Sequence, residues 1–283
     1  MKIRSYIKHI LLLIALYNPF ALTKDIIFDF GGVLILTNNM ASFRQLGMFN
    51  IASCSFQLGI NPFYLNHYIK SRLFDFLNEV AQDPQLAGIA YEQTYDEKGN
   101  ALPMLMSAWL QGTISSSEML ILIENAIPHK SSWFKCSAEK RIIQNLARLI
   151  FTPEIFVRSR KISPAGIAFI KKCKKEGHRV YGLSNWDAES FIVLKQQHPE
   201  LFDLFDGVVI SAEAKANKPH STIYQTLLNR YELKAENCWF IDDQQENIDA
   251  AKKLGINAVR HTSTFANLIK NIKLAYANQK QNL

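Results

Sequence analysis

A small set of polar residues, widely separated along the chain, follows short apolar runs, and their types suit chemistry on a phosphoryl group. They are Asp29, Ser184, Asn185, Lys218, Asp242 and Asp243. Two carboxylates about 4 Å apart repel each other by about 4 kcal/mol at an effective dielectric of about 20, so three that meet need a cation. Oxygen-only ligands favour Mg²⁺, which commonly takes one or two carboxylates and keeps several waters. A lysine and a serine could then hold phosphoryl oxygens while Asp29 attacks the phosphorus to form an aspartyl-phosphate.

The elements that must position these residues alternate between strand and helix patterns. The expected strands are 26–28, 180–183, 208–210, 239–241 and 258–259, and the expected helices are 165–175, 188–197, 222–229 and 246–254. Nearly continuous apolar strands in such an alternation predict an α/β fold with a Rossmann-like parallel sheet covered on both faces. Because open parallel sheets bind ligands beyond the carboxyl ends of their strands, we expect the polar residues to meet at that edge.

The middle of the chain has a different pattern. Apolar residues recur at helical spacing in LNHYIKSRLFDFLNEV, LPMLMSAWL, SSEMLILIENAI and KRIIQNLARLIF, without clear strands. Ser115 and Glu118 have the spacing of a helix capping box. This pattern predicts an inserted α-helical cap over the carboxyl edge of the sheet. The expected parts of the chain are a leader (1–23), the α/β core (24–37 and 162–270), the cap (38–161) and a C-terminal tail (271–283).

The first 23 residues predict a secretory signal peptide. They begin basic, run apolar from 10 to 17 and turn at Asn18-Pro19. The apolar run is shorter than the ~20 residues that span a bilayer, so we expect no stable membrane insertion after leader removal. Residues 21–23 only approximate a cleavage site, and a membrane-associated leader or an ordinary extension are the alternatives. The protein is expected to be exported, periplasmic or secreted, if the leader is cleaved, and cytoplasmic otherwise.

The composition is that of an ordinary globular protein and excludes global disorder, with 48% apolar and 20% charged residues. The net charge of +7 falls to 7 − 3 = +4 when Lys2, Arg4 and Lys8 of the leader are set aside. The other basic residues are scattered, and KKCKK at 171–175 reads as a solvated helix face. We therefore expect no nucleic-acid partner but a small phosphorylated substrate. The sequence does not indicate an oligomeric state.

The segments FDFGGVL, LSN, KP…IY and FIDDQQENIDAAKKLG, taken in this order, resemble the motifs of the haloacid dehalogenase (HAD) superfamily. The resemblance covers roughly residues 24–270 and points to the branch with a helical cap inserted after the first strand. It implies that Asp29 is the nucleophile and a metal ligand, and that Gly31 offers its backbone carbonyl to the metal. Gly31 and Gly32 would bring the backbone close to metal and phosphate.

The same resemblance implies roles for the residues after the later strands. Ser184, with Asn185 beside it, would bind the phosphate, and Lys218 would neutralise its charge. Asp242 and Asp243 would form the acidic pair that binds Mg²⁺, with Asp243 the more direct ligand.

Gly31 is a departure, because phosphatases of this family usually carry there a second aspartate that protonates the leaving group. General acid–base catalysis contributes about 10²–10⁴ in rate, so three functions stay open. The first is a Mg²⁺-dependent phosphatase of small phosphorylated metabolites, whose proton comes from a cap residue or the substrate. The second is a catalytically weak or inactive phosphate-binding protein. The third is a 2-haloacid dehalogenase-type hydrolase, which needs no second acid but is disfavoured by Asp243.

No spacing selects a substitute acid. The candidate histidines are His67, His129 and His220, and the carboxylates of the cap are further candidates. Asp187 is expected to cap the helix that follows it. We interpret Phe74, Phe76 and Trp109 as helix-packing residues of the cap core.

Overall fold

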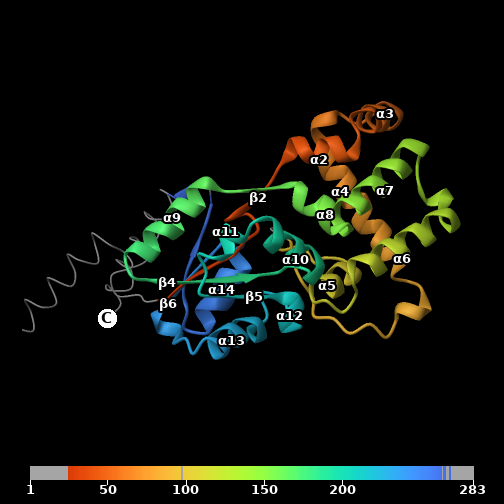
Figure 1. Cartoon of the computed structure of the whole chain (residues 1–283). Helices are drawn as coiled ribbons and strands as arrows, with labels where there is room; N and C mark the ends of the chain where they lie inside the picture. Colours follow the sequence, from red (N-terminus) through yellow and green to blue (C-terminus); the bar gives the residue numbers. More distant parts are fainter. Residues whose placement is uncertain (1–24, 97, 263, 266–267, 269–283) are drawn as a thin grey trace, which may run out of the picture.

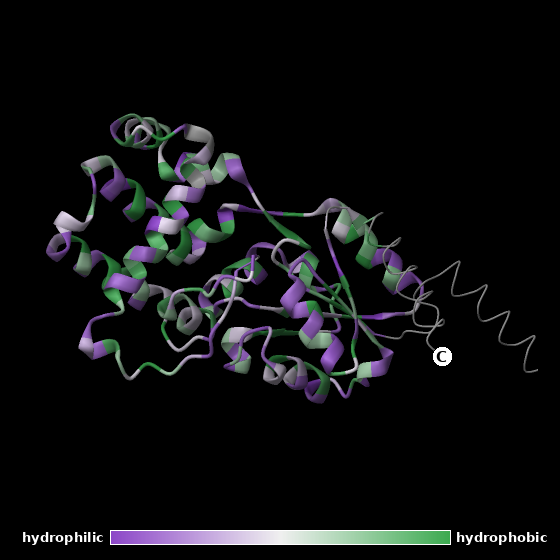
Figure 2. Ribbon diagram, turned by 180° about the vertical axis from the view of Figure 1, so that it is seen from behind, coloured by the Kyte–Doolittle hydropathy of each residue, from purple (hydrophilic) through white to green (hydrophobic). Residues whose placement is uncertain are grey.

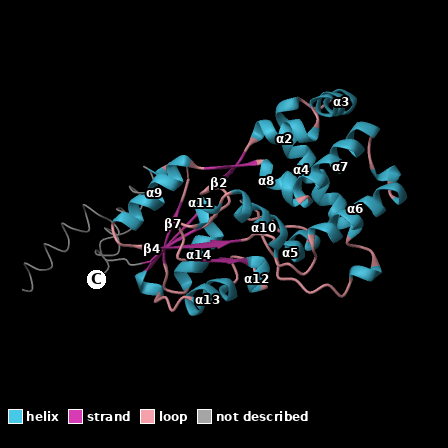
Figure 3. Ribbon diagram, in the orientation of Figure 1, coloured by secondary structure: helices cyan, strands magenta, loops and turns pink. Residues whose placement is uncertain are grey.

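The computed structural model describes residues 25–96, 98–262, 264, 265 and 268. A five-stranded sheet flanked by helices forms one part, and a group of helices lies beside one edge of it (Figures 1 and 3). The predicted leader and the predicted tail lie outside the described residues. No helix within the described part combines the length and the hydrophobicity that crossing a bilayer requires.

All five predicted strands are confirmed, and each extends the predicted run by one residue at one or both ends. They are β1 (Asp25–Phe28), β4 (Arg179–Ser184), β5 (Gly207–Ile210), β6 (Cys238–Asp242) and β7 (Asn257–Arg260). The strands are parallel in the order β5-β4-β1-β6-β7, so the chain moves outward from β1 first on one side and then on the other. This reversal beside β1 is the place where open α/β sheets bind ligands.

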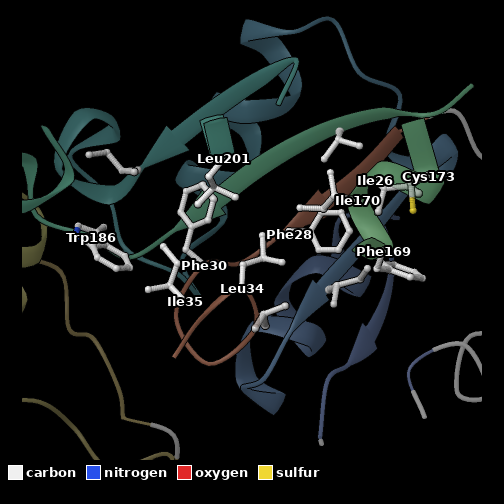
Figure 4. Close-up of a cluster of buried hydrophobic side chains, with 14 of the residues drawn as sticks. Ile26, Phe28, Phe30, Leu34, Ile35, Phe169, Ile170, Cys173, Trp186 and Leu201 are labelled. Carbon is white, nitrogen blue, oxygen red and sulfur yellow. The ribbon is translucent and has the colours of Figure 1, made fainter. Parts of the chain in front are cut away.

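Helices cover both faces of the sheet, as the apolar strands predict. They are α9 (Pro164–Lys175), α10 (Ala188–Gln197), α11 (Pro199–Phe202), α12 (Ser211–Ala214), α13 (Ser221–Arg230) and α14 (Gln245–Lys253). Successive side chains of a strand face opposite sides. Ile26 and Phe28 therefore pack with α9 in one buried cluster (Figure 4), while Ile27 packs with α13 and α14 in another.

Phe30 fixes the loop that follows β1. Its side chain is fully buried, and its ring meets those of Trp186, Phe191, Phe202 and Phe205 at centroid distances of 5.4 to 6.5 Å. Burying such a side chain contributes about 1.5–3 kcal/mol. The flanking residues of the loop are held in place because this ring is anchored.

A helical insert, defined here as residues 39–158, separates β2 (Ile35–Thr37) from β3 (Arg160–Ile162). It contains α2 (Asn39–Leu46), α3 (Met48–Leu58), α4 (Pro62–Val80), α5 (Met104–Leu110), α6 (Ser116–His129), α7 (Ser137–Phe151) and α8 (Pro153–Arg158). Most of its helices carry hydrophilic and hydrophobic residues together, as amphipathic helices do (Figure 2). The capping box is present, because Ser115 accepts from the Glu118 backbone and the Glu118 carboxylate accepts in return. The insert builds its own apolar core.

The two connections to the insert form a small antiparallel sheet, in which Thr37 pairs with Arg160 and Ile35 with Ile162. The pattern of residues 38–161 indicates no strand, and this expectation is wrong at Arg160 and Lys161. The sequence Arg-Lys-Ile has no alternating apolar pattern. These three residues form a strand only because they pair with β2. The helices α2 and α3 were also not predicted, because their residues lack a clear apolar period.

Gly182 in β4 leaves room for the anchoring ring of Phe30. A Cβ at Gly182 would lie 2.7 Å from Cζ of Phe30 and 3.2 Å from Cγ1 of Val208. We expect Gly182→Ala to lower the free energy of unfolding by about 1–3 kcal/mol, because the aromatic cluster must shift. Urea denaturation measures this change. Gly88→Ala is the matched control, since nothing lies within 4 Å of the added carbon, and its change should stay within about 0.5 kcal/mol. Equal losses in the two variants would contradict the argument.

Candidate active site

The structure brings the predicted site residues together at the carboxyl edge of the sheet. Phe28 pairs with Gly182 on one side and with Ile241 on the other, so β1, β4 and β6 end at similar levels. The backbone N–H of Asp29 donates to the Ile241 carbonyl at 2.9 Å. Asp29 thus lies between the ends of its two neighbouring strands.

Two donors hold one oxygen of the Asp29 carboxylate. Oδ1 accepts from the Ser184 hydroxyl at 2.7 Å and lies 2.9 Å from the Lys218 ammonium. The other oxygen, Oδ2, faces the loop, 4.0 Å from the position that a Cβ on Gly31 would take. The contacts therefore orient the carboxylate and leave Oδ2 directed toward the two glycines.

The Lys218 side chain bridges two acids and is only 2% exposed. Besides Asp29 it contacts Oδ2 of Asp242 at 2.6 Å. Its backbone is fixed by Asn185, whose side chain accepts from the Lys218 N–H at 2.7 Å and donates to the Lys218 carbonyl at 2.9 Å. Asn185, which was expected to bind phosphate beside Ser184, is thus already engaged in positioning the lysine loop.

The two acids at the end of β6 have different surroundings. Asp242 is fully buried and accepts from Asn247 Nδ2 at 3.0 and 3.1 Å and from the Gln244 N–H at 2.8 Å. Asp243 is half-buried, and its carboxylate lies against Gly32. A Cβ at Gly32 would lie 2.2 Å from Asp243 Oδ2, and Gly32 has a φ of +71°. Gly32 therefore lets the backbone and this carboxylate approach each other.

Burial and mutual repulsion disfavour the ionised forms of these acids. Burial raises the pKa of Asp29 to about 6 despite the attraction of Lys218. Burial and the neighbouring charges of Asp29 and Asp242 raise the pKa of Asp243 to about 7. Burial lowers the pKa of Lys218, but Asp242 and Asp29 outweigh it, so that pKa lies above its ordinary value and the ammonium is retained.

The acids fit a divalent cation. Asp29, Asp242 and Asp243 each offer a carboxylate oxygen, and these oxygens lie within 4.8 Å of one another. Clustered oxygen donors of this kind suit Mg²⁺. Burial is the main cause of the raised pKa values of Asp29 and Asp243, and a bound cation would offset both this burial cost and the repulsion among the acids.

A cavity of about 580 Å³ adjoins the site and extends between the sheet edge and the helical insert. Its walls include Gly31, Gly32, Asn185 and Gln244 of the loops after β1, β4 and β6, together with residues of the insert. The three candidate histidines are not among the described residues that line it. His220 instead places Nε2 3.0 Å from the Gln93 carbonyl.

Several interpretations of single residues can be compared with the structure. Asp187 caps α10, as expected, by accepting from the Ser190 N–H at 2.9 Å. Phe76 is buried in the core of the insert. Trp109 and Phe74 also belong to that packing, yet both line the cavity, a position that their sequence pattern does not indicate. Apolar periodicity marks one face of a helix as buried and does not distinguish a core from a cavity wall.

A profile of haloacid dehalogenase-like hydrolases matches residues 23–255. The chain belongs to the haloacid dehalogenase-like hydrolases. The resemblance stated from the motifs is thereby confirmed. Among solved structures, a wild-type HAD family enzyme of Bacteroides thetaiotaomicron in complex with magnesium and inorganic phosphate has a TM-score of 0.54 to this HAD-like chain. It is 18% identical, and the match covers 87% of this chain and 98% of that chain. At this identity the similarity shows the fold.

Two curated proteins share part of the HAD-like sequence. The chain is 32% identical over 99 residues to the sesquiterpene phosphatase astK of Aspergillus oryzae, covering 35% of this chain and 50% of that protein. It is 31% identical over 81 residues to the drimenol cyclase drtB of Aspergillus calidoustus, covering 29% of this chain and 15% of that protein. The chain therefore spans half or less of the length of these curated relatives.

The close approach at Gly32 can be tested with two alanine variants. Gly32→Ala should weaken Mg²⁺ binding at least about tenfold, because the added carbon displaces Asp243, and calorimetric titration measures the change. Gly177→Ala is the matched control, since Gly177 has a φ of +86° but nothing within 4 Å. Both variants carry the backbone cost of about 1–2 kcal/mol, but only Gly32→Ala should lose metal. Unchanged Mg²⁺ affinity in Gly32→Ala would contradict this account.

The raised acid pKa values predict that Mg²⁺ stabilises the protein more at high pH. Without metal, Asp29 binds more protons in the folded than in the unfolded state between pH 3.8 and about 6. The same holds for Asp243 between pH 3.8 and about 7. The stability from these groups is therefore present at low pH and is lost as the pH rises through 6 and 7. Mg²⁺ competes with those protons.

The measurement is the Tm with and without Mg²⁺ at pH 5 and at pH 8, with Na⁺ at matched ionic strength as the control. We expect a small Mg²⁺-induced rise at pH 5. At pH 8 the gain should approach about 2.7 kcal/mol when free Mg²⁺ is about 100 times its Kd. A rise that is equal at both pH values would be evidence against carboxylate ligation.

Proposed function

We propose that this HAD-like hydrolase is a Mg²⁺-dependent phosphatase of small phosphorylated metabolites that acts through an aspartyl-phosphate. The observation that carries the proposal is the orientation of Asp29. Oδ1 is held by Ser184 and Lys218, while Oδ2 faces the loop of Gly31 and Gly32. A carboxylate fixed in this way is pre-positioned to attack.

The proposed reaction has two steps. Oδ2 of Asp29 attacks the phosphorus, and the P–O bond to the alcohol breaks as the acyl-phosphate forms. The alcohol oxygen takes a proton and leaves. Water then hydrolyses the acyl-phosphate and releases inorganic phosphate, which restores the carboxylate.

The neighbouring residues bind and position the reacting groups. The Lys218 ammonium has further protons to donate to a phosphoryl oxygen, and the Ser184 hydroxyl would turn its one proton from Asp29 to the phosphoryl group when substrate binds. Asn185 would keep Lys218 in place. Mg²⁺ would be held by the carboxylates of Asp29 and Asp243, with Asp242 next to them, and by the Gly31 carbonyl. When bound, Mg²⁺ supplies charge that offsets the negative charge of the phosphoryl group.

Two relatives support this assignment. One is named a sesquiterpene phosphatase, and the other is an enzyme of the same fold in complex with magnesium and inorganic phosphate. The cluster of Asp29, Asp242 and Asp243 provides oxygen donors for such a metal. The half-buried Asp243 beside Gly32 disfavours the dehalogenase alternative, which needs no metal.

A second candidate is a phosphate-binding protein with weak or no turnover. Gly31 favours it, because a second aspartate two residues after Asp29 is absent from the sequence. A phosphatase with this site must take the proton from a cap residue or expel a leaving group that needs little protonation. Esters of good leaving groups should therefore react fastest.

The proposed export of the protein is a separate matter, because the leader lies outside the described residues. N-terminal sequencing of the mature protein tests it. A start between residues 20 and 25 supports cleavage, and a start at Met1 contradicts it.

The assay for the main proposal measures phosphate release from phenyl phosphate and from sugar phosphates, with Mg²⁺ and with EDTA. Asp29→Asn should reduce kcat by about 10³-fold or more, because the carboxamide is not a nucleophile. Asp25→Asn is the matched control at the start of β1, the strand that Asp29 follows, where Asp25 pairs with the half-exposed Arg179 at 2.6 Å. This control should keep its turnover.

Three outcomes separate the candidate functions. Mg²⁺-dependent release that disappears in Asp29→Asn supports the phosphatase. Tight binding of a phosphate analogue without turnover above background supports the binding protein. Halide release from a 2-haloacid in EDTA would overturn both in favour of the dehalogenase.

A further inference from the structure

The cavity next to Asp29 has the size of an organic ligand. Its volume of about 580 Å³ falls within the roughly 300–1,000 Å³ of small-molecule pockets. One end is formed by Gly31 and Gly32, which follow the nucleophile directly, and by Asn185 and Gln244. A phosphoryl group at the site would therefore place the rest of its ester in this cavity.

The far walls are apolar and come from several helices of the insert. They include Phe43, Leu46, Leu73, Phe74, Leu146 and Ile150. These side chains belong to α2, α4 and α7. Such walls offer mainly carbon surface to a ligand. The hydroxyl of Thr94, another lining residue, is buried without a hydrogen-bond partner among the described residues, but a ligand with several hydroxyl groups would leave most of them unpaired at a cost.

The charged side chains of the cavity wall are engaged within the protein. Lys70 and Asp96 lie 4.0 Å apart. Asp187 accepts from Ser190 and from Ser116. Arg160 stacks on the Phe156 ring, 4.1 Å from its centroid, and donates to Thr37 at 2.7 Å. Most of their polar atoms are thus used within the protein, although Arg160 Nε is buried without a hydrogen-bond partner among the described residues.

We propose that the substrate is a phosphate monoester whose alcohol part is a bulky hydrocarbon body, and that this body fills the cavity. The inference rests on the proposed phosphatase function and adds the substrate class to it. Transfer of hydrocarbon from water to the cavity walls supplies the binding energy. Sugar phosphates of the same size are poor substrates.

The test is a series of 4-alkylphenyl phosphates with tails from methyl to octyl, assayed for phosphate release with Mg²⁺. The leaving group is nearly the same phenol throughout, so differences in kcat/KM within the series come from the alkyl tail. We expect kcat/KM to rise about fourfold for each methylene until the cavity is filled, and then to level off. A tail of equal length built from ethylene glycol units should give kcat/KM at least about tenfold lower than the alkyl tail.

Two matched variants show where the tail binds. Phe43 lines the cavity, whereas Phe49 on the neighbouring helix α3 is 80% exposed and does not. Phe43→Ser should lower kcat/KM for the octyl ester about tenfold and flatten the dependence on tail length. Phe49→Ser should keep the full dependence. Circular dichroism checks that both variants are folded.

The outcomes distinguish this inference from the proposed function. Phenyl phosphate turnover with no dependence on tail length, or equal effects of the two variants, would overturn the hydrocarbon substrate and leave the phosphatase intact. If no ester is hydrolysed, the phosphatase proposal fails, and calorimetric binding of alkylphosphonates still tests the cavity. Affinity that rises with their chain length supports the inference, and constant affinity overturns it.

Discussion

The site depends on one buried cation between two buried anions. Lys218 contacts both Asp29 and Asp242 in a place that solvent barely reaches, and a third acid, Asp243, stands beside them. With all groups ionised, three carboxylates and one ammonium sum to −3 + 1 = −2. Such a charge is costly away from water, and a divalent ion would cancel it. The three acids therefore carry more negative charge than Lys218 alone balances, and a divalent cation would balance the rest.

The protein offsets part of this cost by fixing three of these four groups, namely Lys218, Asp242 and Asp29, through neighbouring residues. Asn185 holds the backbone of Lys218, Asn247 donates to both oxygens of Asp242, and Phe30 anchors the loop after Asp29. None of these three side chains has to take part in bond-making. They keep the reacting atoms aligned, because small displacements would leave the charges unpaired.

Most of the α/β core could be predicted from sequence because the local sequence patterns of its strands and helices agree with the overall fold. The strands are buried on both faces and so read as continuous apolar runs, and helix starts such as Asp187 carry their capping residues. The meeting of the predicted site residues at the ends of β1, β4 and β6 could be expected for the same reason, since parallel strands end at one edge. The pairing of β2 with β3 was missed because three-residue strands depend on a partner far away in the chain.

The cavity could not be predicted for a different reason. A residue such as Phe74 has the periodicity of a packed helix whether its ring meets another helix or an open volume. The use of Asn185 to hold Lys218 likewise depends on two loops that meet only in three dimensions. Sequence patterns record which face of an element is buried, and they do not record what buries it.

The small sheet of β2 and β3 has a consequence for how this protein can change. Thr37 stands opposite Arg160, so the insert leaves the sheet and returns to it at one point. A unit whose ends already meet can be lengthened, shortened or exchanged while the closure at its stem stays the same. The helical insert can thus change in sequence and length while the arrangement of Asp29, Asp242, Asp243 and Lys218 stays the same. Such changes would alter which molecules the cavity accepts and leave those four side chains in place.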